Sequence, residues 1–115
     1  MIKTEHKDIS RNIMDLSAVQ GDSGFINITV DDYTLTSNDK IIFSLGDKEN
    51  ELLSKEASIL SESTAEIHLT GNDLKLSEGQ YYYDIRLIKA DNDVDTIIRP
   101  SVFLILGKSG GESND

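Results

Sequence analysis

The stretch LSEGQYYYDIRLI, residues 76–88, decides which fold class the sequence indicates. From Tyr81 onward, apolar and polar residues alternate with a period of two, the pattern of a β-strand that buries one face. The residues expected on the inward face are Tyr81, Tyr83, Ile85 and Leu87. Tyr82 falls on the opposite face. The sequence therefore predicts that two of the three consecutive tyrosines serve the architecture and that only Tyr82 is free to make contacts.

The residues just before this strand have the spacing of a tyrosine corner. Leu76, Gly79 and Tyr81 form the pattern L-x-x-G-x-Y, which in Greek-key sandwiches occurs where a loop crosses between sheets. Such a loop leaves backbone groups without partners, and a tyrosine hydroxyl can satisfy one of them. We therefore expect Tyr81 to bond back to upstream backbone, with Leu76 packed against its ring.

The same alternation recurs along the chain and predicts an all-β protein. Further strands are expected at residues 13–16, 25–30, 40–45, 51–59, 63–70 and 96–106, separated by clusters of Gly, Asp, Asn and Ser. Pro100 cannot donate to a sheet ladder, so it indicates an edge or a bulge that splits the last strand. A short helical turn is expected at 71–76. These features predict an antiparallel immunoglobulin-like β-sandwich of about seven strands.

The flanks of this domain differ from it in composition. Residues 1–12 are mostly polar, and we expect an N-terminal arm that lies outside the sandwich of residues 13–107. Residues 108–115 contain Gly, Ser and charged or amide side chains, which predicts a flexible tail. The N-terminus has no apolar segment of the kind found in signal peptides, and no run approaches the length of a membrane span. We therefore expect a protein made and folded in the cytoplasm, with no membrane partner.

Composition argues against several kinds of chemistry. The chain has no Cys, which removes thiol nucleophiles and thiolate metal sites, and its net charge of −10 disfavours nucleic acid. Asp91, Asp93 and Asp95 have the opening spacing of an EF-hand loop, but Thr96 stands where that loop requires Gly. We interpret this stretch as a hairpin turn, with opportunistic cation binding as the alternative. No catalytic constellation is recognised, and we expect neither an enzyme nor a cofactor.

A set of turn and core residues resembles those of immunoglobulin-like domains in phage and prophage structural proteins, in particular the N-terminal domain of phage baseplate upper proteins. The resemblance covers residues 20–107 and rests on Gly21, Asp22, Leu69, Thr70, Asp73, Leu76, Gly79, Tyr81, Tyr83, Asp84, Ile85, Thr96, Ile97, Phe103 and Ile105. It implies a non-catalytic tail or baseplate component that is made in the host cytoplasm. Such a component is assembled into the virion by contacts with other phage structural proteins or with its own copies.

The residues expected to make such contacts are Tyr33, Tyr82 and Pro100, together with the arm 1–12. An arm that lacks core residues needs an external partner to order it, and strand addition at a sheet edge is one available mode. The alternative function is a carbohydrate- or surface-binding module, since sandwiches can carry aromatic binding platforms. Exposed Tyr33 and Tyr82 would form that platform.

Overall fold

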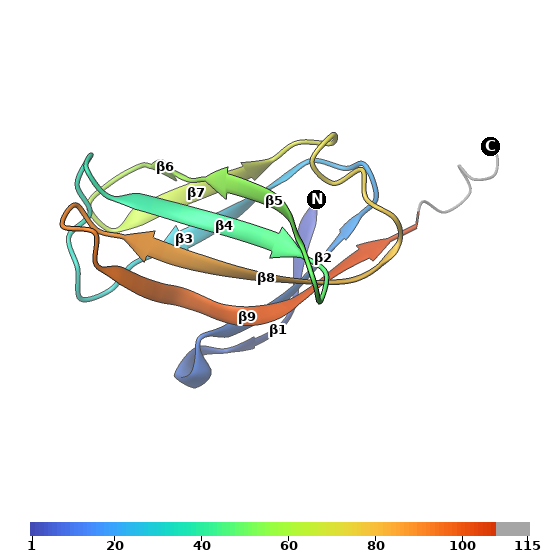
Figure 1. The fold of residues 1–115 in the computed structure, drawn as a ribbon, viewed down its shortest axis with the longest axis horizontal. Coiled ribbons are helices and arrows are strands. Elements are labelled where there is room, and N and C mark those ends of the chain that lie inside the picture. The colour runs from blue at the N-terminus through green and yellow to red at the C-terminus, as the bar shows by residue number, and fades with distance from the viewer. Residues whose placement is uncertain (108–115) are drawn as a thin grey trace.

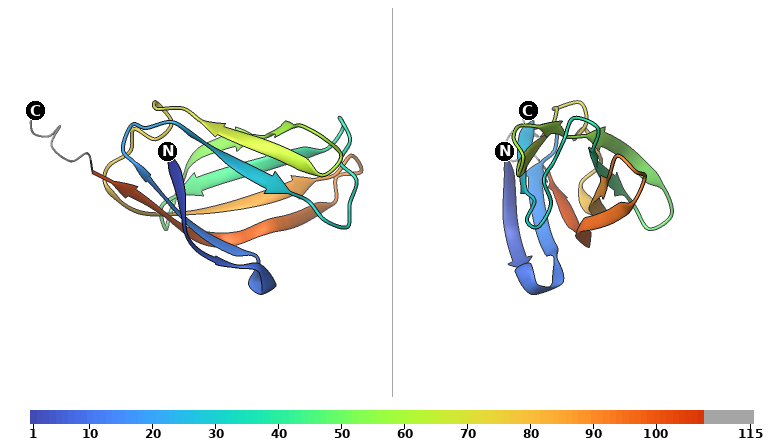
Figure 2. Two further views of the ribbon diagram at one scale, coloured as in Figure 1. Left: turned by 180° about the vertical axis from the view of Figure 1, so that it is seen from behind. Right: turned by 90° about the vertical axis from the view of Figure 1, so that its left-hand side faces the viewer.

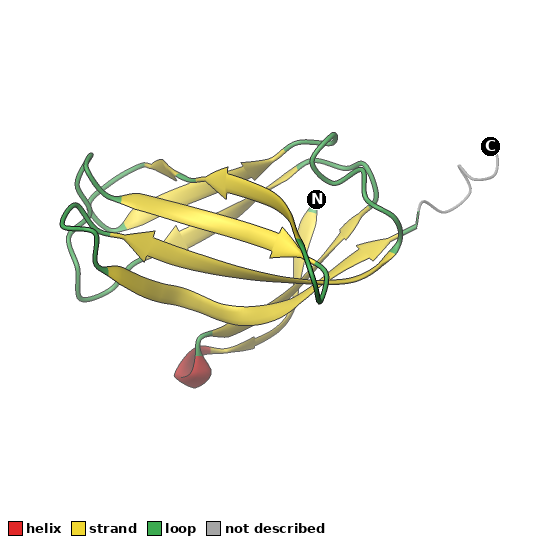
Figure 3. Ribbon diagram, viewed as in Figure 1, coloured by secondary structure: helices red, strands yellow, loops and turns green. Residues whose placement is uncertain are grey.

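The structure is a computed structural model that describes residues 1–107. These residues form nine strands and one short 3-10 helix (Figures 1 and 3). The elements are β1 (Ile2–Asp8), η1 (Ile9–Arg11), β2 (Ile13–Val19), β3 (Gly24–Thr29), β4 (Lys40–Gly46), β5 (Glu51–Glu56), β6 (Ser58–Ile59), β7 (Thr64–Leu69), β8 (Gly79–Ile88) and β9 (Val94–Leu106). The tail predicted at 108–115 lies outside the described residues.

The strands form two sheets that pack face to face, as Figure 2 shows. The larger sheet has the order β1-β2-β9-β8-β4-β5 and the smaller has the order β3-β7-β6. Neighbouring strands are antiparallel except for β2 and β9, which run parallel from the pair Leu16–Phe103 to the pair Val19–Leu106. The prediction of an all-β sandwich is confirmed, but with nine strands rather than seven and with one parallel pair among the described strands.

Side chains from both sheets meet in one core. The buried positions follow the predicted alternation in β3, β4, β7 and β8, and they include Ile26, Ile28, Ile41, Phe43, Leu45, Ala65, Ile67, Leu69, Tyr83, Ile85 and Leu87. Three aromatic rings form its centre. Phe43 stacks on Tyr83 with ring centroids 5.4 Å apart, and Phe103 meets Tyr83 edge-on at 5.8 Å. Tyr81 is only partly buried against this core.

The segment predicted as one middle strand at 51–59 is divided between the two sheets. β5 pairs with β4 in the larger sheet, whereas β6 pairs with β7 in the smaller one. At the bend, the Ala57 amide donates to the Ile41 carbonyl (2.8 Å). This strand switch joins the sheets along one side of the sandwich. The sequence pattern is uninformative here because all six residues of β5 are at least partly exposed.

The prediction of a free arm at residues 1–12 is wrong. Residues 2–8 form β1, which pairs antiparallel with β2, and η1 lies at the tip of the resulting hairpin. Asn12 closes the tip with a left-handed φ of 55°, a conformation that Asn tolerates better than most residues. The five central residues of β1 are all exposed, so an edge strand of this kind carries no apolar alternation.

Two irregular features were expected near the last strands, a helical turn before β8 and an edge or bulge at Pro100. Residues 71–74 form a hydrogen-bonded turn in which the Leu74 amide donates to the Thr70 carbonyl (3.2 Å), the four-residue spacing of a single helical turn. Asp73 and Thr70 exchange side-chain to backbone hydrogen bonds across the same turn. Pro100 lies at a bulge, since the β8–β9 pairing steps from Tyr83–Ser101 to Ile85–Ile98. β9 nevertheless continues through the proline without a break.

Candidate functional site

The predicted corner residues lie at the start of β8 and act within the fold. The Tyr81 hydroxyl donates to the carbonyl of Ser77 (2.6 Å), the upstream bond that the motif predicts. Leu76 packs against the core beside it. Gly79 has a φ of 154°, which side-chain-bearing residues rarely adopt. These contacts fix the crossing of residues 70–79 between the sheets.

Tyr33, a predicted contact residue, is partly buried and makes several contacts within the chain. Its ring packs against the core, and its hydroxyl donates to Asp39 Oδ1 (2.8 Å). Lys89 Nζ lies 4.8 Å from the ring centroid, a cation–π distance. The hydrogen bond to Asp39 raises the pKa of the Tyr33 hydroxyl. The ring that the carbohydrate-binding alternative requires is thus already in contact with Lys89.

Asp39 is buried between two loops that are far apart in the sequence. Its carboxylate accepts hydrogen bonds from the Thr36 amide (2.7 Å), the Ala90 amide (3.0 Å) and the Tyr33 hydroxyl. Burial alone would raise the pKa of Asp39, but the bonds from Thr36, Tyr33 and Ala90 together lower it. The sequence contains no signal for this contact, which ties the loop before β4 to the β8–β9 hairpin.

The aspartates of the β8–β9 hairpin do not come together. Asp91 Oδ1 accepts from the Asp93 amide (3.0 Å), Asn92 adopts a φ of 74°, and Asp95 pairs with Lys89 Nζ at 2.8 Å. Residues 1–107 contain no group of three or more His, Asp or Glu side chains placed to hold a metal ion. The interpretation of this stretch as a hairpin turn accounts for the contacts observed.

Tyr82 and Pro100, the other two predicted contact residues, line the same pocket on the outer face of the larger sheet. The pocket has a volume of about 280 Å³, and its lining also includes Tyr83, Asp84 and residues 44–51, which contain the β4–β5 turn. Gln80 Nε2 donates to the Tyr82 hydroxyl (3.0 Å) at its rim. The sequence predicted the outward direction of Tyr82, but it did not predict that this turn lies beside it.

Two polar atoms in this pocket lack hydrogen-bond partners. Ser44 Oγ and Asp84 Oδ1 are covered from solvent, and neither makes a hydrogen bond to any residue in 1–107. The two residues face each other across the β4–β8 ladder. Arg86 Nε is 3.8 Å from Asp84 Oδ1, beyond hydrogen-bonding distance. Covered polar groups without partners are uncommon in folded proteins.

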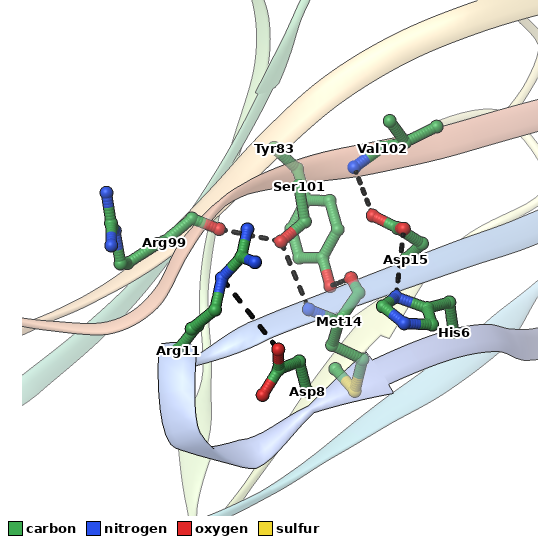
Figure 4. Close-up of polar contacts among 9 residues, drawn as sticks. All are labelled: His6, Asp8, Arg11, Met14, Asp15, Tyr83, Arg99, Ser101 and Val102. Atoms are coloured by element: carbon green, nitrogen blue, oxygen red, sulfur yellow. Dashed lines mark hydrogen bonds and ion pairs between the residues drawn. The ribbon is translucent and has the colours of Figure 1, made fainter.

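A second feature is the junction where the β1–β2 hairpin joins the rest of the larger sheet (Figure 4). Regular β2–β9 pairing begins only at Leu16, and side chains bridge the strands before that point. Asp15 Oδ1 accepts from the Val102 amide (2.9 Å), and Ser101 Oγ accepts from the Met14 amide (3.1 Å). The buried Tyr83 hydroxyl donates to the Met14 carbonyl. These bonds join the base of the hairpin to β9 and, through Tyr83, to β8.

The hairpin itself extends past the sandwich, with η1 at its outer end (Figures 1 and 2). Ile9, in η1, is 78% exposed, and Arg11 Nε lies 3.8 Å from Asp8 Oδ2 beside it. The outer edge of β1 has no neighbouring strand within residues 1–107. The tip therefore presents an apolar side chain and an open strand edge together.

In comparisons with known proteins, no protein-family model and no curated protein matches the chain. The structure defines the class as an all-β protein with two packed sheets. Within the part of the chain that the structure describes, no helix has the length and apolar character needed to cross a membrane.

Proposed function

We propose that this chain is a non-catalytic structural or adaptor protein of a phage or prophage particle, of the tail or baseplate type, and that it acts through protein–protein contacts. The fold proposed for it is immunoglobulin-like. The order β9-β8-β4-β5 corresponds to strands G-F-C-C′ of that fold, and β3-β7-β6 corresponds to B-E-D. The turn and core residues that resemble phage domains support the same assignment.

The observation that carries the proposal is the projecting β1–β2 hairpin. Covering a large apolar side chain at an exposed tip stabilises the complex, by about 1.5–3 kcal/mol for full burial of an Ile. The free edge of β1 can also pair with another strand. Because side-chain hydrogen bonds hold the base of the hairpin on β9, binding at the tip costs little ordering.

Light scattering coupled to size-exclusion chromatography, over a wide concentration range, tests this proposal. We expect assembly of the protein with itself or with tail and baseplate proteins. Ile9→Asp should abolish that assembly, because it places a charge at the tip. Leu60→Asp is the matched control, since Leu60 is a similarly exposed apolar residue between β6 and β7. A protein that stays monomeric throughout and binds no tail or baseplate protein would contradict the proposal.

A further inference from the structure

We propose that the outer edge of β1 pairs antiparallel with β1 of a second copy of this chain, about a two-fold axis that passes between Glu5 and His6. The inference deepens the proposed function and rests on it, because it names the partner of the projecting hairpin. β1 lies at the edge of the larger sheet, with no neighbouring strand on its outer side within residues 1–107 (Figure 2). An exposed strand edge presents backbone donors and acceptors that a second strand can use.

The charges along this edge are complementary about its midpoint. Residues 2–9 read IKTEHKDI. In an antiparallel pair centred between Glu5 and His6, these two residues face each other across the copies. Lys3 of each copy faces Asp8 of the other, and no two like charges are opposed. Opposite charges that face each other on neighbouring strands stabilise the pair, whereas like charges destabilise it.

A β-bulge in β1 places the two central residues on one face of the sheet. The β1–β2 register shifts between Thr4 and His6, so Glu5 is an extra residue in β1. Glu5 Oε2 accepts from Ser17 Oγ (2.6 Å), and His6 Nδ1 lies 3.6 Å from Asp15 Oδ2. Asp15 and Ser17 lie two residues apart in β2 and share a face, so Glu5 and His6 share that face as well.

The outer two charges of β1 lie on the same face as the central pair. Lys3 is opposite Ser17, and Asp8 is opposite Ile13, which belongs to the same alternating set of β2 positions. In a two-fold dimer that extends the sheet, residues that face each other across the copies must share a face. Without the bulge, a midpoint between two successive residues would put the members of each pair on opposite faces. The bulge therefore permits the charge-matched register.

Neighbouring registers do not meet this condition. Pairing centred on Glu5 would put Lys3 opposite Lys7, and pairing centred on His6 would put Glu5 opposite Lys7. Lys7 is opposite Met14 of β2 and so lies on the face away from the other charges. Pairing centred on Glu5 would also bring two Glu5 carboxylates together, which is destabilising. The positions of the charges thus favour one register.

The same register covers the apolar side chains at the two ends of the edge. Met1 and Ile9, which precede and follow β1, are both largely exposed. Antiparallel pairing brings the Ile9 end of one copy to the Met1 end of the other. Burial of these side chains and backbone pairing supply the affinity, whereas the charge pairs select the register, because exposed ion pairs contribute little by themselves.

The test is charge reversal followed by sedimentation velocity. Lys3→Asp and Asp8→Lys, each alone, should raise the Kd of the dimer on the order of tenfold, because attractive pairs become repulsive. An equimolar mixture of the two variants should recover the wild-type Kd, because each reversed charge then faces the other. Lys40→Asp is the control, since it makes the same change of charge at an exposed residue of β4, away from the edge.

A second measurement avoids substitution of Asp8, which caps η1 by accepting from the Ser10 amide (3.1 Å). The chain has no Cys, so introduced cysteines report on proximity alone. Thr4 and Lys7 face each other across the proposed pair. A mixture of Thr4→Cys and Lys7→Cys should therefore form disulfide-linked dimers between the two variants. A mixture of Lys3→Cys and Lys7→Cys should cross-link more slowly, because these residues lie on opposite faces.

The outcomes separate this inference from the proposed function. Cross-linking without preference for the Thr4–Lys7 combination, or a mixture of the charge variants that dimerises no better than either alone, would overturn the inference. If the pairing fails while Ile9→Asp still abolishes assembly, only this inference falls, because the tip then contacts another surface. If the chain stays monomeric and binds no tail or baseplate protein, the proposed function falls as well.

Discussion

Tyr83 connects the core to the projecting hairpin through a single hydroxyl group. Its ring lies among Phe43 and Phe103, and its side chain is 2% exposed. The hydroxyl donates to the Met14 carbonyl of β2, which belongs to the base of the hairpin. The same side chain therefore contributes apolar burial and satisfies a backbone group where β2 and β9 diverge.

Tyr83→Phe should lower the free energy of unfolding by about 1–3 kcal/mol, because it leaves a covered carbonyl without its donor. Tyr81→Phe makes the same chemical change at the start of β8. The bond from Tyr81 to Ser77 is exposed, so water can replace it and the loss should be nearer 0.5 kcal/mol. Urea unfolding of the two variants measures the difference. Equal losses would contradict the role of the Met14 contact.

Tyr83 should also make the stability of the protein fall in alkaline solution. Burial, and secondarily the charge of Asp15, raise the pKa of Tyr83 above its ordinary value of about 10. Above that value the unfolded chain loses the phenolic proton while the folded chain retains it, so the free energy of unfolding decreases as pH rises. The wild type should have a higher urea midpoint than Tyr83→Phe at neutral pH. This difference in midpoint should shrink above pH 10.

The alternating pattern around Tyr83 was sufficient to predict that it is buried, because period two fixes the face of a strand. It could not predict the acceptor, since Met14 lies 69 residues away and belongs to a strand that pairs with β9 rather than with β8. The local corner bond of Tyr81 was predictable, because its acceptor is only four residues upstream. Sequence patterns inform about faces and local turns more than about distant partners.

At the scale of elements, Asp39 joins the loop before β4 to the β8–β9 hairpin. Asp39→Asn replaces one carboxylate oxygen with a donor and should release the Thr36 amide and hydroxyl, which bond Oδ2. We expect a lower urea midpoint at pH 7. Asp31→Asn is the control in the same loop, because it makes the same chemical change at an exposed residue.

The pH dependence of that difference identifies its cause. The hydrogen bonds lower the pKa of Asp39 in the folded chain, so its contribution to stability is present above the ordinary value of about 4 and is lost as pH falls through the lowered value. The difference in urea midpoint between the wild type and Asp39→Asn should therefore become smaller in acid. A difference that stays constant with pH would indicate a packing defect instead.

Elements with one buried face were the predictable ones. β3, β4, β7 and β8 each alternate and were located from sequence alone. β1 was missed because its central side chains are all exposed, and the β5–β6 switch was missed because a bend between sheets has no fixed period. At the pocket, Tyr82 and Pro100 were predicted, whereas Ser44 and the β4–β5 turn reach the pocket only through strand pairing.

At the scale of the whole molecule, a net charge of −10 sets the sign of the salt response. Copies of the chain repel one another, whereas a basic partner is attracted. The Debye length falls from about 10 Å at 0.1 M salt to about 3 Å at 1 M, so added salt removes both effects. Self-association through the apolar tip should therefore strengthen with salt.

Sedimentation velocity at low and high sodium chloride tests this expectation. The wild type should show assembly that increases with salt, whereas Ile9→Asp should lose it and Leu60→Asp should retain it. Self-association that weakens with salt would mean that charged groups rather than Ile9 hold the copies together, and it would contradict an apolar contact at the hairpin tip.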